Sequence, residues 1–408
     1  KVQEFFSGAR AGGHGPFSPL PQRGGGGGGR STADVAIIGG GVHGCSIAWH
    51  LGKRGVKAVL FERDYISSGS SGRSAAGLRY QFGTEVNCRL ARYNMEKIPQ
   101  LQEELGFKAD LEYDPAGYLW IAYSETQLEQ LKKNVALQNS LGVGSVILDP
   151  DGIKEVAPGL DVRGMLGASF NEKDGHVNPH AMNYAYADAA RGLGVDIRTG
   201  TSVTGLLVDG HRVRGVRTER GDWETGAVIC AVNAWSREVC GWCGLDVPVT
   251  PERHQILVTE PVERMKHPMT LCLDDGCYWK QCPNGTFMFG WDNPEEKKDT
   301  SFESSWQFPE EVSKRVLAKM PCLAGVRVVR QWTGPYAVTP DEQAIMGRTP
   351  VENFFFVGGW SGHGLQFAPS SGRIMSEIVL GEEPFLDVSC FRFSRFEEGC
   401  LYPEPACI

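Results

Sequence analysis

The stretch DVAIIGGGVHGCSIAWHLGKRGVKAVLFE, residues 34–62, decides the fold. It begins with a short apolar strand, passes through a Gly-x-Gly-x-x-Gly turn, and continues with the apolar spacing of a helix that ends near Gly55. KAVLF follows as a second strand and leads to the acidic Glu62. Strand, glycine turn, helix, strand and acid in this order are typical of a dinucleotide-binding unit.

Each conspicuous residue of this unit has a physical task. Gly39 permits the tight turn, Gly41 lets a pyrophosphate approach the backbone, and Gly44 lets helix and strand pack closely. The helix N-terminus offers unpaired N–H groups and the positive end of its dipole to the phosphates. Glu62 is placed to accept hydrogen bonds from the adenosine ribose, and Arg63 beside it is counted among the predicted cofactor-binding residues.

The segment after Glu62 favours FAD over a nicotinamide cofactor. Residues 66–83, ISSGSSGRSAAGLRYQFG, are rich in serine and glycine where a nicotinamide enzyme more often continues with a helix. Small hydroxyl side chains, here Ser70 and Ser71, can donate to the phosphate and ribitol oxygens of an extended cofactor. The competing interpretation is a flexible surface loop.

Length and composition narrow the class of protein. The 408 residues suffice for two domains with a sizeable core. The net charge of −8 argues against general affinity for nucleic acid, and no apolar run approaches the roughly 18 residues that suggest a membrane span. The twelve cysteines include one Cys-x-x-Cys pair, Cys240 and Cys243, but no second pair completes a zinc site, so no metal is predicted. Scattered free cysteines indicate a reducing compartment, and we expect a cytoplasmic protein.

The two ends of the chain are expected to lie outside the folded core. Residues 1–33 contain a six-glycine run and three prolines, and such a composition predicts disorder. The same segment contains three arginines and only one acidic residue, which is also compatible with the remnant of a mitochondrial targeting peptide. The mitochondrial matrix is therefore the alternative location. Residues 397–408 are expected to form a C-terminal tail.

The remaining pattern predicts an α/β fold, α+β overall, in which a Rossmann-type FAD-binding domain is interleaved with a strand-rich substrate domain. Helical spacing covers about 86–105 and 125–141, whereas residues 245–335 are rich in strand and turn signals. We assign the FAD-binding domain to residues 34–100, 175–244 and 336–396, and the substrate domain to residues 101–174 and 245–335.

Five sequence blocks carry a more specific resemblance: ADVAIIGGGVHGCSIAWHL, SSGRSAAGLRYQF, AVICAVNAWS, VRQWTGPYAVTPDEQAIMG and FFFVGGWSGHGLQFAPSSGR. In this order they resemble the D-amino acid oxidase-like superfamily of FAD-dependent oxidoreductases. Within it, the chain looks like the branch of the sarcosine oxidase and proline dehydrogenase beta subunits, and is similar to mitochondrial FAD-dependent oxidoreductase-domain proteins. The resemblance covers about Asp34 to Phe396.

The resemblance implies that a late glycine loop returns to the flavin and leads into a helix whose N-terminus faces the pyrimidine edge. Here that loop is Gly359–Gln366, and the helix is expected to begin near Ala368 or Pro369. A positive helix end would stabilise the negative charge of reduced flavin. The further cofactor-binding residues implied by the resemblance are Gly359, Gly362, His363, Gly364, Val203 and Trp235.

The resemblance also implies a reaction, the oxidation of a C–N bond in a small amino or imino acid by hydride transfer to flavin N5. The arginine with which relatives hold the substrate carboxylate matches Arg79, and a guanidinium can meet a carboxylate with two parallel hydrogen bonds. The lysine of the late loop is replaced by Gln366, which donates a hydrogen bond but carries no charge. Arg79, His363 and Gln366 are the predicted catalytic residues, while Tyr336 and Trp332 either line the pocket or belong to the core.

Several alternatives stay open. Arg79 could be a salt-bridged surface residue and His363 a core histidine. Some heteromeric relatives carry FMN on a histidine, but the matching position here is Pro179, with His180 one step later. We therefore expect at most a noncovalent FMN at an interface with a partner subunit. The alternative functions are a flavin-binding assembly or scaffold protein with little turnover and, less favoured, a nicotinamide-dependent dehydrogenase.

Overall fold

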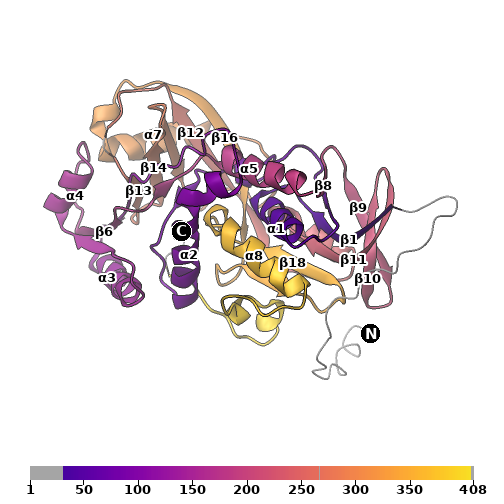
Figure 1. Ribbon diagram of the computed structural model, residues 1–408. Helices are drawn as coiled ribbons and strands as arrows, with labels where there is room; N and C mark the ends of the chain where they lie inside the picture. Colours follow the sequence, from indigo (N-terminus) through magenta and orange to yellow (C-terminus); the bar gives the residue numbers. More distant parts are fainter. Residues whose placement is uncertain (1–30, 266, 406–408) are drawn as a thin grey trace.

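The computed structural model describes residues 31–265 and 267–405, and its two large sheets lie at opposite ends of the molecule (Figure 1). One sheet is mainly parallel, and the other is mainly antiparallel. The predicted fold class is therefore confirmed. The predicted disorder of residues 1–30 lies outside the described residues.

The first sheet builds the nucleotide half. Its strands follow the order β17-β18-β11-β1-β2-β8, with β10 bonded to β11 and β9 bonded to β10. Their bounds are β1 (Ser31–Ile38), β2 (Ala58–Phe61), β8 (Asp196–Arg198), β9 (Val203–Asp209), β10 (Arg212–Thr218), β11 (Gly221–Cys230), β17 (Ile345–Arg348) and β18 (Phe354–Gly358).

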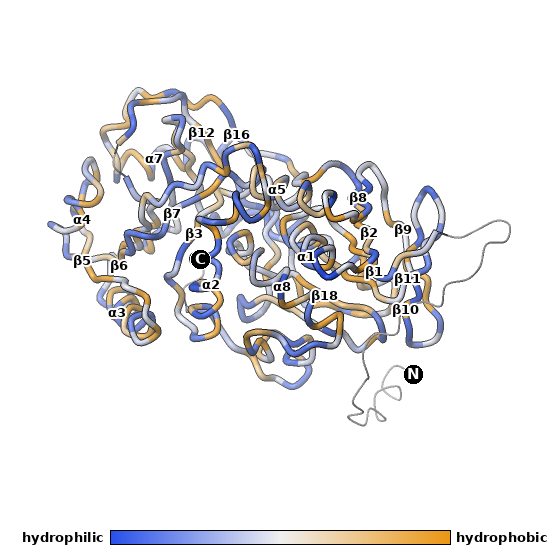
Figure 2. The backbone as a smooth tube through the Cα atoms, viewed as in Figure 1, coloured by the Kyte–Doolittle hydropathy of each residue, from blue (hydrophilic) through white to orange (hydrophobic). Residues whose placement is uncertain are grey.

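The central strands of this sheet are buried on both faces, as expected for parallel strands covered on either side. In β1, Val35 and Ile37 enter one hydrophobic core, while Ala36 and Ile38 enter the core on the opposite face. A continuous apolar run is therefore required, and Figure 2 shows β18 as a hydrophobic segment of the same kind.

Helices α1 (Val42–Lys53), α5 (Pro179–Gly192) and α8 (Ala368–Val379) cover one face of the sheet (Figure 1). The crossing of α1 and α8 is close because Gly372 has no side chain: a Cβ there would lie 2.1 Å from Ser46 Oγ. The Ser46 hydroxyl donates to the Ala368 carbonyl at 2.7 Å. The first and last of the five sequence blocks are thereby joined at one helix pair.

The second sheet has the order β16-β12-β15-β14-β13-β4-β6-β5. The bounds are β4 (Tyr118–Ala122), β5 (Val146–Leu148), β6 (Gly167–Asn171), β12 (Thr250–Thr259), β13 (Met269–Cys272), β14 (Cys277–Gln281), β15 (Phe287–Trp291) and β16 (Val328–Val338). A short pair, β3 (Gly77–Leu78) and β7 (Gly175–His176), lies apart from both sheets. The remaining helices are α2 (Glu85–Glu104), α3 (Glu125–Ser140), α4 (Pro150–Val156), α6 (Ser236–Gly241) and α7 (Gln307–Lys319).

The expected helices at 86–105 and 125–141 correspond to α2 and α3 within one residue at each end. Helix α7 was not predicted, because it lies in a region that reads as strand and turn. Its signal is the spacing of Phe308, Val312 and Val316, which are buried in the core of the second sheet.

Three predicted segment boundaries need correction. β1 begins at Ser31 rather than Asp34, because Ser31–Ala33 pair with Trp223–Thr225 of β11. The boundary at residue 100 cuts α2, whose Leu101 packs in the nucleotide-side core. The boundary at residue 335 cuts β16, which pairs with β12 along its length up to Val338.

The predicted C-terminal tail, residues 397–408, also needs correction as far as it is described. Glu404 is buried and hydrogen-bonded to Gly83 and Thr84, the two residues before α2. The chain up to Pro405 is therefore folded against the body.

Candidate FAD and substrate site

The glycines of the first turn are fixed by close backbone contacts. Gly39 has a φ of +111°, and a Cβ on it would lie 2.6 Å from the Ala231 carbonyl oxygen. A Cβ on Gly44 would lie 2.0 Å from the Gly39 carbonyl oxygen. Both distances are far below van der Waals contact, so any side chain would force the turn open. Gly41 faces only Ser71 Oγ, at 3.3 Å from its would-be Cβ.

A cavity of about 460 Å³ begins at this turn, in front of the N-terminus of α1. The Val42 N–H donates to Ser71 Oγ at 3.1 Å, so the turn and the serine-rich loop form one wall. The predicted cofactor-binding residues that line the cavity are Gly39, Gly41, Glu62, Arg63, Ser70, Ser71, Val203, Trp235, Gly362 and Gly364. Gly44, Gly359 and His363 do not line it.

Glu62 ties the turn to the loop that follows β2. One carboxylate oxygen accepts the Gly40 N–H at 2.7 Å. The other accepts the Asp64 N–H at 2.8 Å and the Ser68 hydroxyl at 3.2 Å. A carboxylate has about four acceptor positions, so one is left for a ribose hydroxyl. The Gly40 contact was not predicted, because it depends on the depth of the turn.

The late glycine loop forms the opposite end of the cavity. Gly362 has a φ of +88°, and a Cβ there would lie 2.5 Å from the Tyr336 ring. Gly359 lies behind the wall, where its N–H donates to Asn233 Oδ1 at 3.2 Å and its absent Cβ makes room for Thr339. The loop leads through a 3₁₀ turn, Leu365–Phe367, into α8, which starts at Ala368 as expected.

His43 is a cavity residue that the sequence argument did not select. Its ring is stacked on Trp360, with centroids 4.5 Å apart, and its Nδ1 lies 2.6 Å from Ser371 Oγ. Burial lowers the pKa of His43 to about 3, so the ring is neutral at physiological pH. Its position inside the Gly-x-Gly-x-x-Gly turn was the available signal.

A second, smaller cavity of about 70 Å³ adjoins the first. The two share Ser74, Tyr336, Gly362 and Leu365 as walls. All three predicted catalytic residues line the smaller cavity, together with the tyrosines Tyr118, Tyr278 and Tyr336. Trp332 does not line it; its indole N–H donates to the Arg73 carbonyl at 3.0 Å instead.

Arg79 is a buried wall of the smaller cavity rather than a surface residue. It is 8% exposed, and its guanidinium lies between the rings of Phe82 and Trp120, 4.5 and 4.6 Å from their centroids. The Tyr118 hydroxyl is within hydrogen-bonding reach of the guanidinium. The two aromatic faces stabilise the cation and fix the plane of its donors.

A buried carboxyl group lies behind Arg79. Asp174 accepts the Tyr80 N–H at 2.7 Å and the Gln81 side-chain amide at 2.9 Å. Burial raises the pKa of Asp174 to about 7, although these hydrogen bonds and the Arg79 charge act against the rise. Near neutral pH this carboxyl group therefore compensates Arg79 only in part.

Gln366 fixes the backbone of Arg79. Its Oε1 accepts the Arg79 N–H at 2.7 Å. Its Nε2 is buried and has no hydrogen-bond partner within the described residues. This amide group is the donor that the smaller cavity offers beside the guanidinium.

His363 is neutral in this setting. Burial, reinforced by the neighbouring Arg79 charge, lowers the pKa of His363 to about 3. The ring also meets Phe82 and Phe367 edge-on. His363 therefore contributes shape and polarity to the smaller cavity without adding a charge.

Comparison with known proteins agrees with this geometry. The sequence profile of the DAO family, described as FAD dependent oxidoreductase, matches residues 34–378. The chain belongs to this family of FAD-dependent oxidoreductases.

Two relatives and two solved structures show how far the similarity extends. The sarcosine oxidase subunit beta of Rhodobacter capsulatus is 30% identical, over 91% of this chain and 90% of that protein. FAD-dependent oxidoreductase domain-containing protein 1 of Xenopus laevis is 29% identical, over 93% of this chain and 85% of that protein. L-proline dehydrogenase from P. horikoshii has a TM-score of 0.86 and 31% identity, over 91% of this chain and all of that chain. Glycine oxidase from Bacillus cereus has a TM-score of 0.76 and 26% identity, over 86% of this chain and 96% of that chain.

The residues of this DAO-family site fit the FAD that the family uses. The larger cavity has a glycine cradle that a Cβ would disrupt, a helix N-terminus for the phosphates, and a carboxylate at the adenosine end. It continues to Trp360 and Gly364, so an extended cofactor would reach the smaller cavity. FAD is therefore the cofactor of this protein.

Two other kinds of site are not found in the described part of the chain. Between residues 31 and 405, apart from residue 266, no group of three His, Cys, Asp or Glu side chains is placed to hold a metal ion. The helices of the same residues include none with the length and apolar character to cross a membrane. Cys240 and Cys243 are both free thiols.

Proposed function

We propose that this FAD-dependent oxidoreductase oxidises the C–N bond of a small amino or imino acid. The observation that carries the proposal is the buried guanidinium of Arg79 at the wall of a small cavity that adjoins the cofactor cavity. The related structures are named for proline and glycine, and the curated relatives for sarcosine. All three compounds are small molecules with an amine next to a carboxylate.

The chain's own residues would hold such a substrate by its carboxylate. Arg79 offers two parallel donors whose plane is set by Phe82 and Trp120. Gln366 adds its unpartnered amide as a further donor. When bound, FAD supplies the acceptor for the hydride equivalent that leaves the substrate carbon. His363, being neutral, adds no second positive charge that would repel a substrate amine.

The cavity volume favours small substrates. At about 70 Å³ it is well below the roughly 300 to 1,000 Å³ of pockets for drug-sized ligands. Tyr278 and Tyr336 are among its walls. We therefore expect sarcosine, glycine and proline to be better substrates than amino acids with long side chains.

An anaerobic reduction screen tests the proposal. The FAD-loaded protein is mixed with sarcosine, proline, hydroxyproline, glycine and N-methyl amino acids while the loss of flavin absorbance is followed. At least one compound should reduce the wild type, whereas Arg79→Ala should lose about 2 to 5 kcal/mol of carboxylate binding and keep its FAD. Arg79→Lys is the matched control, because it keeps the charge without the planar fork. Equal reduction of wild type and Arg79→Ala would place the carboxylate elsewhere.

The same screen separates the alternative functions. Full FAD content with no reduction by any compound would favour an assembly or scaffold protein of this fold. The replacement of the relatives' lysine by Gln366, which removes a charge from the clamp, is the feature that motivates this alternative. Tight binding of NAD without any flavin would contradict both the proposed oxidoreductase activity and the scaffold alternative.

Partner subunits are part of the proposal because the bacterial relatives are named as beta subunits. A second flavin stays a prediction. Pro179 is the first residue of α5, and the ring of the next residue, His180, lies against Gly72. Acid extraction should therefore release all flavin without a covalent remainder. FMN in that extract would appear only when a partner subunit copurifies.

A further inference from the structure

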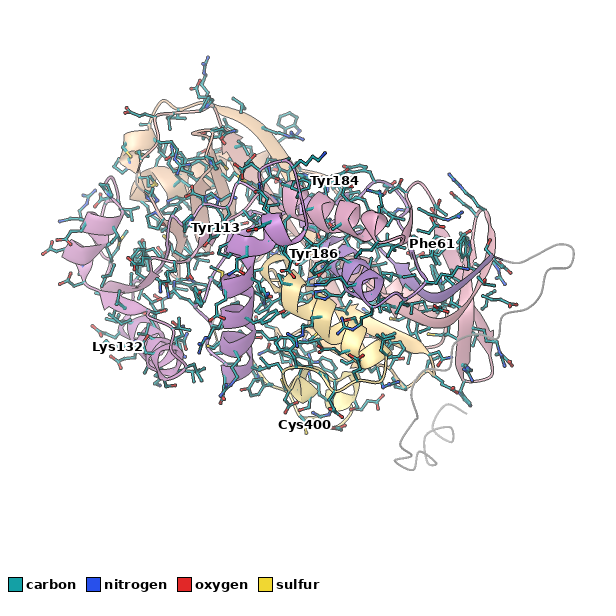
Figure 3. All side chains as sticks on the ribbon, viewed as in Figure 1. Phe61, Tyr113, Lys132, Tyr184, Tyr186 and Cys400 are labelled. Carbon is teal, nitrogen blue, oxygen red and sulfur yellow. The ribbon has the colours of Figure 1, made fainter. Side chains whose placement is uncertain are left out.

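The C-terminal strap, residues 395–405, packs against the loop that follows Arg79. At its first end, the Arg395 guanidinium makes two 2.9 Å hydrogen bonds to Asp341, and both side chains are fully buried. The Glu404 N–H donates to the Asp341 carbonyl at 3.2 Å. Between these anchors the chain passes the exposed Cys400, labelled at the lower edge of Figure 3. The strap is thus held at both ends on the turn that contains Asp341.

The side chain of Glu404 accepts from three donors, two in the loop before α2 and one in the first turn of α2. It is 2% exposed and accepts the Gly83 N–H at 2.6 Å, the Thr84 hydroxyl at 2.6 Å and the Asn87 amide at 2.7 Å. Hydrogen bonds to a charged acceptor are stronger than neutral ones. The backbone is packed as closely, because a Cβ on Gly83 would lie 2.3 Å from Pro405 Cγ.

The loop that the strap holds is the support of the Arg79 guanidinium. Phe82, the residue before Gly83, places its ring 4.5 Å from that guanidinium. The Phe82 carbonyl accepts the Gln138 side-chain amide at 2.9 Å, which gives the loop a second point of attachment. Glu404, Gly83, Phe82 and Arg79 therefore form one continuous series of contacts.

We propose that Glu404 is a positioning residue for the substrate carboxylate, acting through the loop of Phe82–Thr84 on Arg79. The inference rests on the proposed function, in which Arg79 binds that carboxylate. A two-bond guanidinium–carboxylate contact requires one orientation of the guanidinium, and the orientation depends on the aromatic face beneath it. Within the described residues, the strap lines neither the larger nor the smaller cavity, so its effect is expected on substrate affinity and not on FAD affinity.

Glu404→Ala in the full-length, FAD-loaded protein tests the inference. Acetate serves as the carboxylate probe, and its dissociation constant is measured from the oxidised flavin spectrum. The constant should rise about tenfold, which corresponds to about 1.4 kcal/mol, while the FAD dissociation constant stays within about twofold. With an amine substrate, KM should rise and kcat should stay unchanged. Glu397→Ala is the matched control, since Glu397 is an exposed acid of the same strap and should change neither constant.

A second pair of variants guards against simple misfolding. Glu404→Gln keeps an acceptor for Gly83 but sets an amide against the Asn87 amide, so acetate binding should weaken. Adding Asn87→Asp returns an acceptor opposite the new donor. It should restore part of the affinity once the Gln343 amide, whose Oε1 accepts the Asn87 amide at 2.8 Å, turns its N–H toward the new carboxylate. A double variant as weak as the worse single variant would contradict the proposed contact.

Hydrogen exchange of the amides of residues 79–87 separates this inference from the proposed function. Faster exchange in Glu404→Ala, with unchanged acetate affinity, would overturn the positioning role. Unchanged exchange would show that the strap does not hold the loop and would overturn it as well. If Arg79→Ala binds acetate as the wild type does, the proposed function fails, and positioning of substrate by Glu404 fails with it, even where exchange shows that the strap holds the loop.

Discussion

The phosphate cradle and the substrate cavity differ in how the chain makes them. The cradle is built mainly from one stretch between Gly39 and Ser71, with Ala231 of a distant strand end packed behind Gly39. The substrate cavity takes its walls from segments around residues 74–79, 118, 269–278, 336 and 361–366. A local site is fixed by turn chemistry, whereas a site of distant segments depends on how the two sheets pack. Substitutions in the two sites should therefore fail in different ways.

The largest effect is expected in the cradle. Gly44→Ala would place a Cβ 2.0 Å from the Gly39 carbonyl oxygen, which no rotamer change can relieve. We expect a loss of about 3 kcal/mol in unfolding free energy, typical of overpacking, together with loss of FAD on purification. Chemical denaturation and flavin content would measure both.

Gly192→Ala is the matched control for that substitution. Gly192 ends α5, has no atom within 4 Å of its would-be Cβ, and does not require a left-handed backbone. Its replacement should be neutral or stabilise the protein by up to about 1 kcal/mol. Equal losses in the two variants would refute the view that close backbone contact makes the cradle sensitive.

The second effect concerns Glu62, where the cradle meets the adenosine end. Glu62→Ala removes the acceptor of the Gly40 N–H as well as the predicted ribose contact. Each charge-assisted bond is worth roughly 1.5 to 3 kcal/mol, so FAD affinity should fall at least about tenfold. Fluorescence titration of the apoprotein with FAD checks this. Glu62→Gln, which keeps one acceptor, should lose less, and identical losses would mean that a neutral acceptor contributes nothing there without the charge.

The same comparison explains what the sequence could predict. The cradle glycines, α1 and β2 follow from local turn and helix signals, whereas the start of α8 was implied by the resemblance and β1 begins three residues earlier than expected. The resemblance selected Arg79, His363 and Gln366, which line one cavity in the structure. It could not show that Arg79 is stacked between Phe82 and Trp120. Such contacts depend on the packing of separate strands and have no local sequence signal.

The C-terminal strap is the clearest case of this limit. The Glu404 carboxylate meets the Gly83 N–H across 321 residues, and no period, turn motif or composition in residues 395–405 indicates it. The boundaries inside α2 and β16 failed for the same reason, since each element is placed by partners that lie far away in the chain.

The third effect belongs to the substrate cavity. Gln366→Lys would supply the positive charge that the resemblance implies at this position, but it would also remove the acceptor of the Arg79 N–H. Leaving a buried donor unpaired costs about 1 to 3 kcal/mol, so the variant should unfold more easily in urea. Gln366→Glu keeps the acceptor and should retain stability. It should instead bind acetate more weakly, because its charge neutralises that of Arg79. If Gln366→Glu were less stable than Gln366→Lys, the Arg79 backbone would have to be held by other contacts.

The smallest effect is the pH dependence that the cavity imposes on stability. The pKa of His363 falls from 6.5 to about 3 on folding, so below pH 6.5 the unfolded chain takes up a proton that the folded protein refuses. The stability due to neutral His363 is complete above pH 6.5 and is lost as the pH falls toward 3. The slope is at most about 1.4 kcal/mol per pH unit, and less because His363 is only half-buried.

His363→Gln should flatten that slope, measured as unfolding free energies in urea at pH 6 and pH 5. Asp174→Asn should act in the opposite direction. The pKa of Asp174 rises from 3.8 to about 7 on folding, so its contribution is complete below pH 3.8 and is lost as the pH rises through 7. Removing it should make stability rise more steeply with pH between these values. If both variants give curves parallel to the wild type, the histidine and the carboxyl group are solvated, and the substrate cavity is more open than its contacts indicate.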